Sequence, residues 1–200
     1  MNFFEEIGKY QIILGSQSPR RQYLLKELGL KFDVKLKQMV QEVYPENLSK
    51  EEIPLYLARM KADAFDDELN EHTIVITADT IVWKDDQVLQ KPKDEKESYD
   101  ILRSLSGTVH QVYTAVCIRS LNQKSTFSSR TDVYFKDLTD KEIWYYIDKY
   151  EPFDKAGSYG IQEWLGYIGV EKIEGSFFNV MGLPVQKLYV ELKKFLNIKN

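Results

Sequence analysis

The chain has 200 residues, 43% of them hydrophobic, which is enough for a substantial core in one large domain or two small lobes. Its formal net charge of -4 gives no general attraction for nucleic acid or for acidic membranes, so neither is an expected partner. Cys117 is the single cysteine, which excludes an internal disulfide and predicts a buried structural thiol. The first ten residues lack the basic start and unbroken apolar run of a signal peptide, and no later run could span a bilayer; a cytoplasmic location is therefore expected.

The first half of the chain alternates apolar strands with helices. Strands are predicted over residues 12–14, 32–36 and 73–83, and helices over residues 19–28 and from about residue 50 to 66. The second helix has two candidate starts, because Ser49 and Glu52 form a capping box whereas Pro54 suits a later start. After the third strand, a turn at residues 84–87 returns the chain as a hairpin.

The second half adds antiparallel strands and amphipathic helices. Helices are predicted over residues 95–105, around residues 143–147 and from residue 184 to 195, and strands over residues 109–118 and 127–135. Thr139 and Glu142 form a capping box before the middle helix. Because no repeat, linker or low-complexity tract interrupts the pattern, we expect a single α/β domain over residues 1–200 with substantial antiparallel pairing.

Two arginines lie at the start of the helix predicted over residues 19–28, where cations are ordinarily unfavourable. Ser18 is a suitable N-cap and Pro19 a suitable first helical residue. Arg20 and Arg21 therefore fall in the first turn, beside unpaired amide N–H groups. A strand, a Gly/Ser loop and a helix start together form a phosphate site, to which arginines add bidentate donors. The pattern predicts an anion over this helix start; the alternative is that each arginine extends into solvent or pairs with a carboxylate.

Asp79 interrupts the Ile- and Val-rich strand at residues 74–82, which should otherwise be buried. Burial of an unpaired carboxylate is unfavourable by several kcal/mol, so Asp79 needs a cation, a metal ion or good donors. If residues 85–86 are a two-residue hairpin loop, the ladder puts Thr80 opposite Lys91 and makes Lys91 a neighbour of Asp79. A structural ion pair explains these residues equally well on this pattern alone.

Three further segments join tight turns to large apolar residues. Residues 151–162 are dense in Pro, Gly and polar residues yet carry large apolar groups, so we predict an ordered, functional loop. Residues 105–110 and 179–184 are expected to be structural joints. His110 begins a strand, and its expected role is that of a hydrogen-bonded histidine rather than a catalytic one.

Together these segments resemble the Maf family of nucleoside triphosphate pyrophosphatases, from Leu14 through Pro184. Each segment alone is a weak signal, but all occur in the order and approximate spacing of the family. They are Ser-x-Ser-Pro-Arg-Arg at residues 16–21, Ala-Asp-Thr at 78–80, Lys-Pro at 91–92, Ser-Gly-x-x-His at 106–110, Lys-Ala-Gly-Ser-Tyr-Gly-Ile-Gln at 155–162 and Asn-Val-Met-Gly-Leu-Pro at 179–184.

The resemblance implies a Maf/ITPase-like fold, in which a mixed, largely antiparallel twisted sheet is flanked by helices in two lobes around a central cleft. It also implies hydrolysis of a nucleoside triphosphate to its monophosphate and pyrophosphate, with a divalent metal cation, Mg²⁺ or Mn²⁺, as cofactor. The motifs at residues 20–21, 78–80 and 159–162 resemble the branch that acts on dTTP and UTP. Members of the family are often dimers, so a homodimer is a further expectation.

The resemblance assigns roles to individual residues. Asp79 corresponds to the catalytic proton acceptor and, with Glu42, to the metal site. The family usually has Gly at the position of Gln90 and Gly directly after the position of Gln162, where this chain has Glu163. The second departure changes the loop beside the expected base pocket. The expected substrate-binding residues are Ser16, Arg20, Arg21, Lys61, Thr80, Lys91 and Gln162, of which Arg20, Thr80 and Gln162 match positions tied to base selectivity.

Asp79 is expected to orient or deprotonate a water for attack on the α-phosphorus, while Lys61 and Lys91 neutralise developing charge. One alternative is a non-catalytic nucleotide-binding regulator of cell division, which needs the arginine loop but has no use for a carboxylate within a buried strand beside a lysine. Another is an interaction protein with an ordinary ion-paired core, which explains Asp79 and Lys91 but not the arginine loop.

Overall fold

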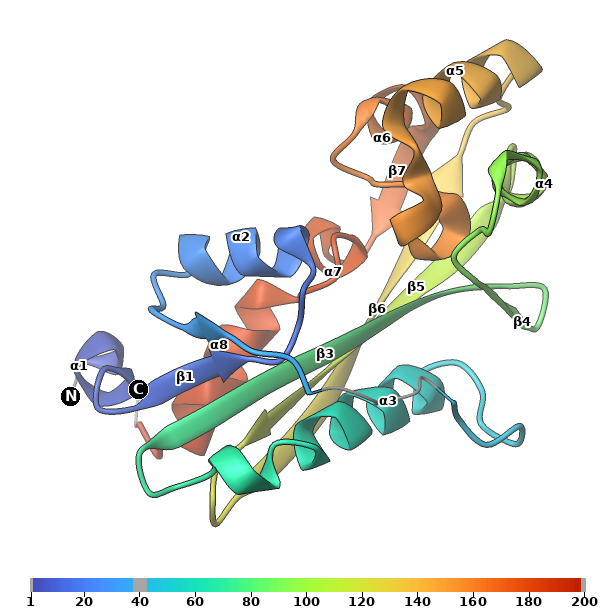
Figure 1. Ribbon diagram of the computed structural model, residues 1–200. Coiled ribbons are helices and arrows are strands. Elements are labelled where there is room, and N and C mark those ends of the chain that lie inside the picture. Colours follow the sequence, from blue (N-terminus) through green and yellow to red (C-terminus); the bar gives the residue numbers. More distant parts are fainter. Residues whose placement is uncertain (1, 38–42, 199–200) are drawn as a thin grey trace. The chain divides into compact units, whose positions relative to one another are not determined.

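A computed structural model describes residues 2–37 and 43–198, and Figure 1 shows the elements along the chain. Glu42, one of the two expected metal ligands, lies outside the described residues. The helices are α1 (Phe3–Ile7), α2 (Pro19–Glu27), α3 (Glu52–Asp63), α4 (Glu95–Leu105), α5 (Asp140–Tyr150), α6 (Trp164–Gly169), α7 (Phe177–Val180) and α8 (Val185–Phe195). The strands are β1 (Gln11–Leu14), β2 (Asp33–Val34), β3 (Thr73–Lys84), β4 (Gln87–Leu89), β5 (Val109–Arg119), β6 (Lys124–Phe135) and β7 (Val170–Glu174).

Within the described ranges, the strands form a seven-stranded sheet in the order β2-β1-β3-β5-β6-β7, with β4 paired to β3. β1 runs parallel to both β2 and β3, whereas β3–β4 and β6–β7 are antiparallel pairs. β5 and β6 are joined by a short turn, in which the Ser120 amide donates to the Gln123 carbonyl at 2.8 Å. The prediction of a mixed α/β fold, with a sheet flanked by helices, is confirmed. β2 is shorter than the predicted strand at residues 32–36.

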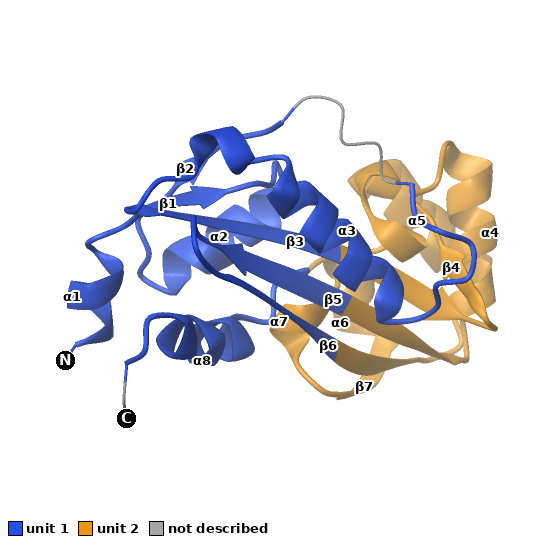
Figure 2. Ribbon diagram, turned by 90° about the horizontal axis from the view of Figure 1, so that it is seen from below, with its two compact units in different colours: residues 1–79, 114–129, 182–200 blue, residues 80–113, 130–181 orange. Residues whose placement is uncertain are grey.

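The chain divides into two compact units, which Figure 2 distinguishes by colour. Unit 1 comprises residues 1–79, 114–129 and 182–200, and unit 2 comprises residues 80–113 and 130–181. The strands β3, β5 and β6 each contribute residues to both units. The predicted single domain and the predicted cleft between two lobes stay predictions.

In unit 1, α3 covers one face of the sheet, and α2 and α8 lie on the other (Figures 1 and 2). Ala58 and Ala62 of α3 pack against Ala115 and Cys117 of β5. These small side chains let the helix approach closely, and the Thr77 hydroxyl donates to the Ala58 carbonyl at 2.6 Å. Cys117 is a free, buried cysteine, as predicted, and burial raises the pKa of its thiol.

The start of α3 and the buried face of α8, both in unit 1, can be compared with the predictions. α3 begins at Glu52 with Glu51 as its N-cap, so the capping box that would place Ser49 at the N-cap is wrong, although the Ser49 amide does donate to Glu52 Oε2 at 3.0 Å. Pro54 lies in the first turn of α3, where its missing N–H is harmless. α8 is amphipathic as predicted, and it buries Leu188, Leu192 and Phe195.

No helix in residues 2–37 or 43–198 combines the length and apolar character needed to cross a membrane.

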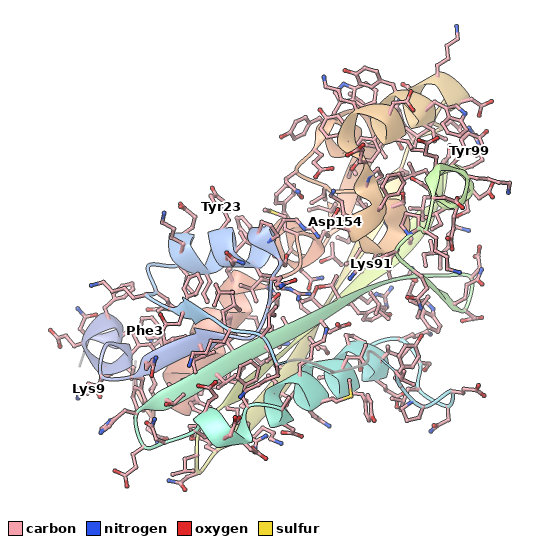
Figure 3. The ribbon with its side chains drawn as sticks, in the orientation of Figure 1. Phe3, Lys9, Tyr23, Lys91, Tyr99 and Asp154 are labelled. Carbon is pink, nitrogen blue, oxygen red and sulfur yellow. The ribbon has the colours of Figure 1, made fainter. Side chains whose placement is uncertain are left out.

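In unit 2, α4 packs against α5. Tyr99, which Figure 3 labels, stacks on Trp144 with ring centroids 5.0 Å apart. The Tyr99 hydroxyl also donates to Asp140 Oδ1 at 2.7 Å. The predicted capping box of Thr139 and Glu142 is present in full at the start of α5. These contacts hold the helices that adjoin the 151–162 segment.

His110 is fully buried in unit 2, at the start of β5. Its Nε2 lies 2.7 Å from the Tyr159 hydroxyl, and its ring packs edge-on against Phe135. Burial lowers the pKa of His110 to about 3, and the positive charge of Lys84 acts in the same direction. The imidazole is therefore neutral at physiological pH, as expected of a hydrogen-bonded core histidine.

This burial predicts a stability difference between pH 7 and pH 5. The pKa of His110 is depressed in the folded state, so its contribution to stability is complete above pH 6.5 and declines as pH falls toward 3. Between pH 7 and pH 5 the wild type should lose about 2 kcal/mol more free energy of unfolding than His110→Gln. Urea unfolding at both pH values measures the difference, with His72→Gln as the matched exposed control. Parallel losses in wild type and His110→Gln would contradict a neutral buried imidazole.

Candidate active site

The loop between β1 and α2 has the geometry predicted for an anion-binding helix start. Ser18 is the N-cap, and its side chain accepts from the Arg21 amide at 3.5 Å. Pro19 is the first helical residue. A Cβ on Gly15 would lie 2.8 Å from Thr77 and 2.9 Å from Phe65, so only glycine fits where the loop leaves the strand. The sequence therefore folds this loop tightly against β3.

Arg21 fixes this loop from within unit 1. Its Nε donates to the Gly182 carbonyl at 2.8 Å, and its Nη1 donates to Ser16 Oγ at 3.2 Å and to the Ala78 carbonyl at 2.9 Å. These acceptors come from three segments far apart in the sequence, and one of them immediately precedes Asp79. The guanidinium thus joins Ser16 to the middle of β3, next to Asp79. Its predicted role in phosphate binding stays a prediction.

Replacement of Arg21 by lysine should therefore weaken the fold even though the charge is kept. A single ammonium group cannot match the geometry of the planar fork, so at least one of the three carbonyl and hydroxyl acceptors loses its donor. We expect Arg21→Lys to lower the free energy of unfolding by about 1–3 kcal/mol. Arg59→Lys, on the exposed side of α3, is the control. Urea unfolding that gives equal stability for Arg21→Lys and the control would show that charge alone is what Arg21 supplies.

Asp79 and Lys61 form a buried ion pair in unit 1. Asp79 lies on β3 and is 6% exposed, and Lys61 lies in the last turn of α3. Lys61 Nζ is 2.5 Å from Asp79 Oδ1, and the two side chains are 16% and 8% exposed. A cation therefore neutralises the carboxylate, as burial demands.

The predicted β3–β4 ladder, which would make Lys91 a neighbour of Asp79, is confirmed only next to the turn. Lys84 pairs with Gln87 as predicted, and Asp85 has the positive φ of a tight hairpin turn. The ladder ends at Leu89, however, so it does not extend to Lys91. Strand register predicts partners only on neighbouring strands. Lys61, which lies on α3, was therefore assigned to the site by the family resemblance alone.

Unit 1 thus holds Ser16, Arg20, Arg21, Lys61 and Asp79 of the expected site. The remaining described members belong to unit 2. Thr80 is half-buried on β3, directly after Asp79, and Lys91 is exposed after β4. The Gly157 amide donates to the Gln90 carbonyl at 3.3 Å, which ties the Lys91 segment to the 151–162 segment; Figure 3 labels Lys91 and Asp154 on these two segments.

The 151–162 segment contains two short 3₁₀ turns, Pro152–Asp154 and Ala156–Ser158. The buried Ser158 hydroxyl is hydrogen-bonded to the Ser98 hydroxyl of α4 at 2.5 Å. Lys155 is 7% exposed, and its ammonium lies 2.7 Å from Asp154 and 3.3 Å from Glu163. The sequence did not predict that Lys155 is buried, nor that it pairs with Glu163, which stands where the family usually has glycine.

The residues present fit a hard divalent cation. Asp79 has carboxylate oxygens, the kind of ligand that such a cation prefers, and the carbonyl of its neighbour Ala78 accepts a hydrogen bond from Arg21. Among residues 2–37 and 43–198, no group of three or more His, Cys, Asp or Glu side chains gathers to hold a metal ion. Mg²⁺ does not require one, because it is usually held by one or two carboxylates together with phosphate oxygens and water.

The chain has an α/β fold with a helix start that Arg21 anchors next to a carboxylate–ammonium pair, an arrangement that suits a phosphate-bearing ligand. The chain belongs to the Maf family: the family model, described as Maf-like protein, matches residues 11–195.

Curated relatives resemble the chain over nearly its whole length. A dTTP/UTP pyrophosphatase of Phocaeicola vulgatus is 54% identical over 190 residues, which cover 95% of this chain and 98% of the relative. A dTTP/UTP pyrophosphatase of Parabacteroides distasonis is 53% identical over 191 residues, which cover 96% and 99%. Among solved structures, a HAM1 protein from Coxiella burnetii is a more distant match, with 14% identity, a TM-score of 0.42 and coverage of 63% of this chain and 73% of its own.

Proposed function

We propose that this chain hydrolyses dTTP and UTP to the corresponding monophosphates and pyrophosphate. The observation that carries the proposal is the Lys61–Asp79 pair next to Ala78 of β3, whose carbonyl and Ser16 Oγ accept from the same guanidinium of Arg21. A phosphate-binding loop can hold the triphosphate, and a carboxylate can act on the attacking water. The relatives that match this chain over more than 90% of its length are named for the same activity.

The proposed division of labour follows the positions of the side chains. Ser16, Arg20, Arg21 and the amides at the start of α2 bind the triphosphate, since the helix start and the guanidinium groups both favour anions. Asp79 orients or deprotonates the water that attacks the α-phosphorus, and pyrophosphate leaves. Lys61 and Lys91 neutralise the charge that develops in the transition state.

Mg²⁺ or Mn²⁺ would be held by Asp79 and Glu42. When bound, such a cation lowers the pKa of a coordinated water and offsets phosphate charge. Thr80 and Gln162, with Arg20, would select the base. We further propose a cytoplasmic enzyme that binds neither nucleic acid nor membrane and forms a homodimer.

A panel of nucleoside triphosphates tests this proposal. Pyrophosphate release should be fastest with dTTP and UTP, slower with CTP and purine nucleotides, and lost when EDTA replaces Mg²⁺. Release of orthophosphate instead of pyrophosphate would contradict the proposed bond cleavage. Tight nucleotide binding without release from any triphosphate would favour the non-catalytic nucleotide-binding regulator of cell division.

A further inference from the structure

Glu163 is the centre of a hydrogen-bonded cluster in unit 2. Its carboxylate accepts from the Tyr146 hydroxyl, lies 3.3 Å from the Lys155 ammonium and lies 3.5 Å from Gln162 Nε2. The Tyr146 hydroxyl in turn accepts from the Gly160 amide at 3.0 Å. The cluster therefore ties three positions of the 155–162 segment to one carboxylate.

The carboxylate acts in this cluster as an ionised acceptor. Burial raises the pKa of Tyr146, and its hydrogen bond to Glu163 raises it further, so this phenol stays protonated and donates. The ammonium of Lys155 is a second, charged donor. An ionised carboxylate only accepts, and so the Gln162 amide must turn its NH₂ group toward Glu163.

With the NH₂ group of Gln162 turned toward Glu163, the amide oxygen of Gln162 points the other way. This oxygen, Oε1, is buried and has no hydrogen-bond partner among the described residues. The backbone of Gln162 is held as well, because the Tyr167 hydroxyl donates to its carbonyl at 2.5 Å. A fixed, buried acceptor without a donor is unfavourable in the free protein and suits a ligand that brings an N–H group.

The close approach depends on the glycine two residues before Gln162. A Cβ on Gly160 would lie 2.7 Å from the Glu163 carboxyl carbon and 3.0 Å from Gln162 Nε2. With a larger residue at position 160, the Glu163 carboxylate or the Gln162 amide would have to shift. The small size of Gly160 thus helps Glu163 to contact the Gln162 amide.

We propose that Glu163 is a positioning residue for base selection: it orients the Gln162 amide so that Oε1 accepts the N3–H that thymine and uracil share. Cytosine has an unprotonated N3 at this place, and its lone pair would face the amide oxygen. Discrimination therefore comes from a fixed amide direction, which a freely rotating glutamine could not supply. A base reaches Oε1 only when the residues that cover it move aside. The inference rests on the proposed function for its substrate class.

The test measures binding, so that it does not depend on turnover. Dissociation constants for the α,β-imido analogues of UTP and CTP are compared in wild type, Glu163→Gln and the exposed control Glu171→Gln, which lies on β7. A neutral Gln at position 163 offers either end of its own amide, so the amide of Gln162 is free to turn over. Glu163→Gln should reduce the UTP preference about tenfold, while Glu171→Gln leaves it unchanged.

A double mutant separates positioning from general loop support. In a Gln162→Leu background, Glu163→Gln should have no further effect on the UTP:CTP ratio, because no amide remains to be oriented. Equal weakening of both analogues by Glu163→Gln, with the ratio kept, would overturn the inference and assign Glu163 a structural role. So would an equal change in ratio with and without Gln162. Hydrolysis of dTTP and UTP by the wild type is assayed separately, so failure of the proposed activity is seen independently of this binding result.

Discussion

Asp79→Asn should reduce turnover of dTTP and UTP by about 10²–10⁴-fold and still allow the nucleotide to bind. The substitution keeps the size of the side chain and removes both its charge and its ability to accept a proton. The binding groups at the start of α2 do not depend on that charge, because Arg21 is held there by Ser16, Ala78 and Gly182. Steady-state hydrolysis and titration with a non-hydrolysable analogue measure the two effects.

Asp86→Asn is the matched control for this experiment. Asp86 is exposed in the β3–β4 turn and has a φ of 57°, a conformation that asparagine tolerates. Its replacement makes the same chemical change a few residues further along the chain and should leave turnover at the wild-type level. Hydrolysis by Asp79→Asn at the rate of this control would refute the catalytic role of Asp79.

Lys61→Met should be strongly destabilising. Asp79 is 6% exposed, and removal of the ammonium 2.5 Å from its carboxylate leaves a buried charge without this cation. Loss of one partner from a buried ion pair typically lowers the free energy of unfolding by about 3–5 kcal/mol. Turnover should fall as well, since Lys61 is proposed to neutralise charge in the transition state.

The double mutant Lys61→Met/Asp79→Asn distinguishes a buried pair from two independent residues. With both charges gone, much of the stability lost in Lys61→Met should return, whereas turnover should not. Lys96→Met is the control, because Lys96 and Asp100 form an exposed pair on α4 whose loss should leave stability almost unchanged. Additive losses in the double mutant, measured by urea unfolding, would contradict coupling between Lys61 and Asp79.

Local signals in the sequence predicted local structure well. Ser18 and Pro19 defined the start of α2, and Thr139 with Glu142 defined that of α5, because capping depends on neighbours in the chain. The two-residue hairpin also paired Lys84 with Gln87 as predicted. Short elements carry too few residues to show a period, so α1, α6, α7 and β7 were not predicted.

The candidate site was harder to predict where its contacts join distant segments. The sequence indicated that Asp79 needs a partner, but the choice of Lys61 depends on how α3 packs on the sheet. In the same way, the position of Arg21 suggested an anion site, whereas its bonds to Ala78 and Gly182 require the tertiary fold. Glu163 was visible only as a departure from the family pattern, and its cluster appears only in the structure.

Hydrolysis in ¹⁸O-labelled water tests the central claim most directly. If Asp79 directs water to the α-phosphorus, a single turnover of dTTP with Mg²⁺ places the label in the monophosphate and leaves pyrophosphate unlabelled. Mass spectrometry of both products reads this outcome. Label in pyrophosphate, or release of orthophosphate as the first product, would contradict attack at the α-phosphorus and with it the proposed reaction.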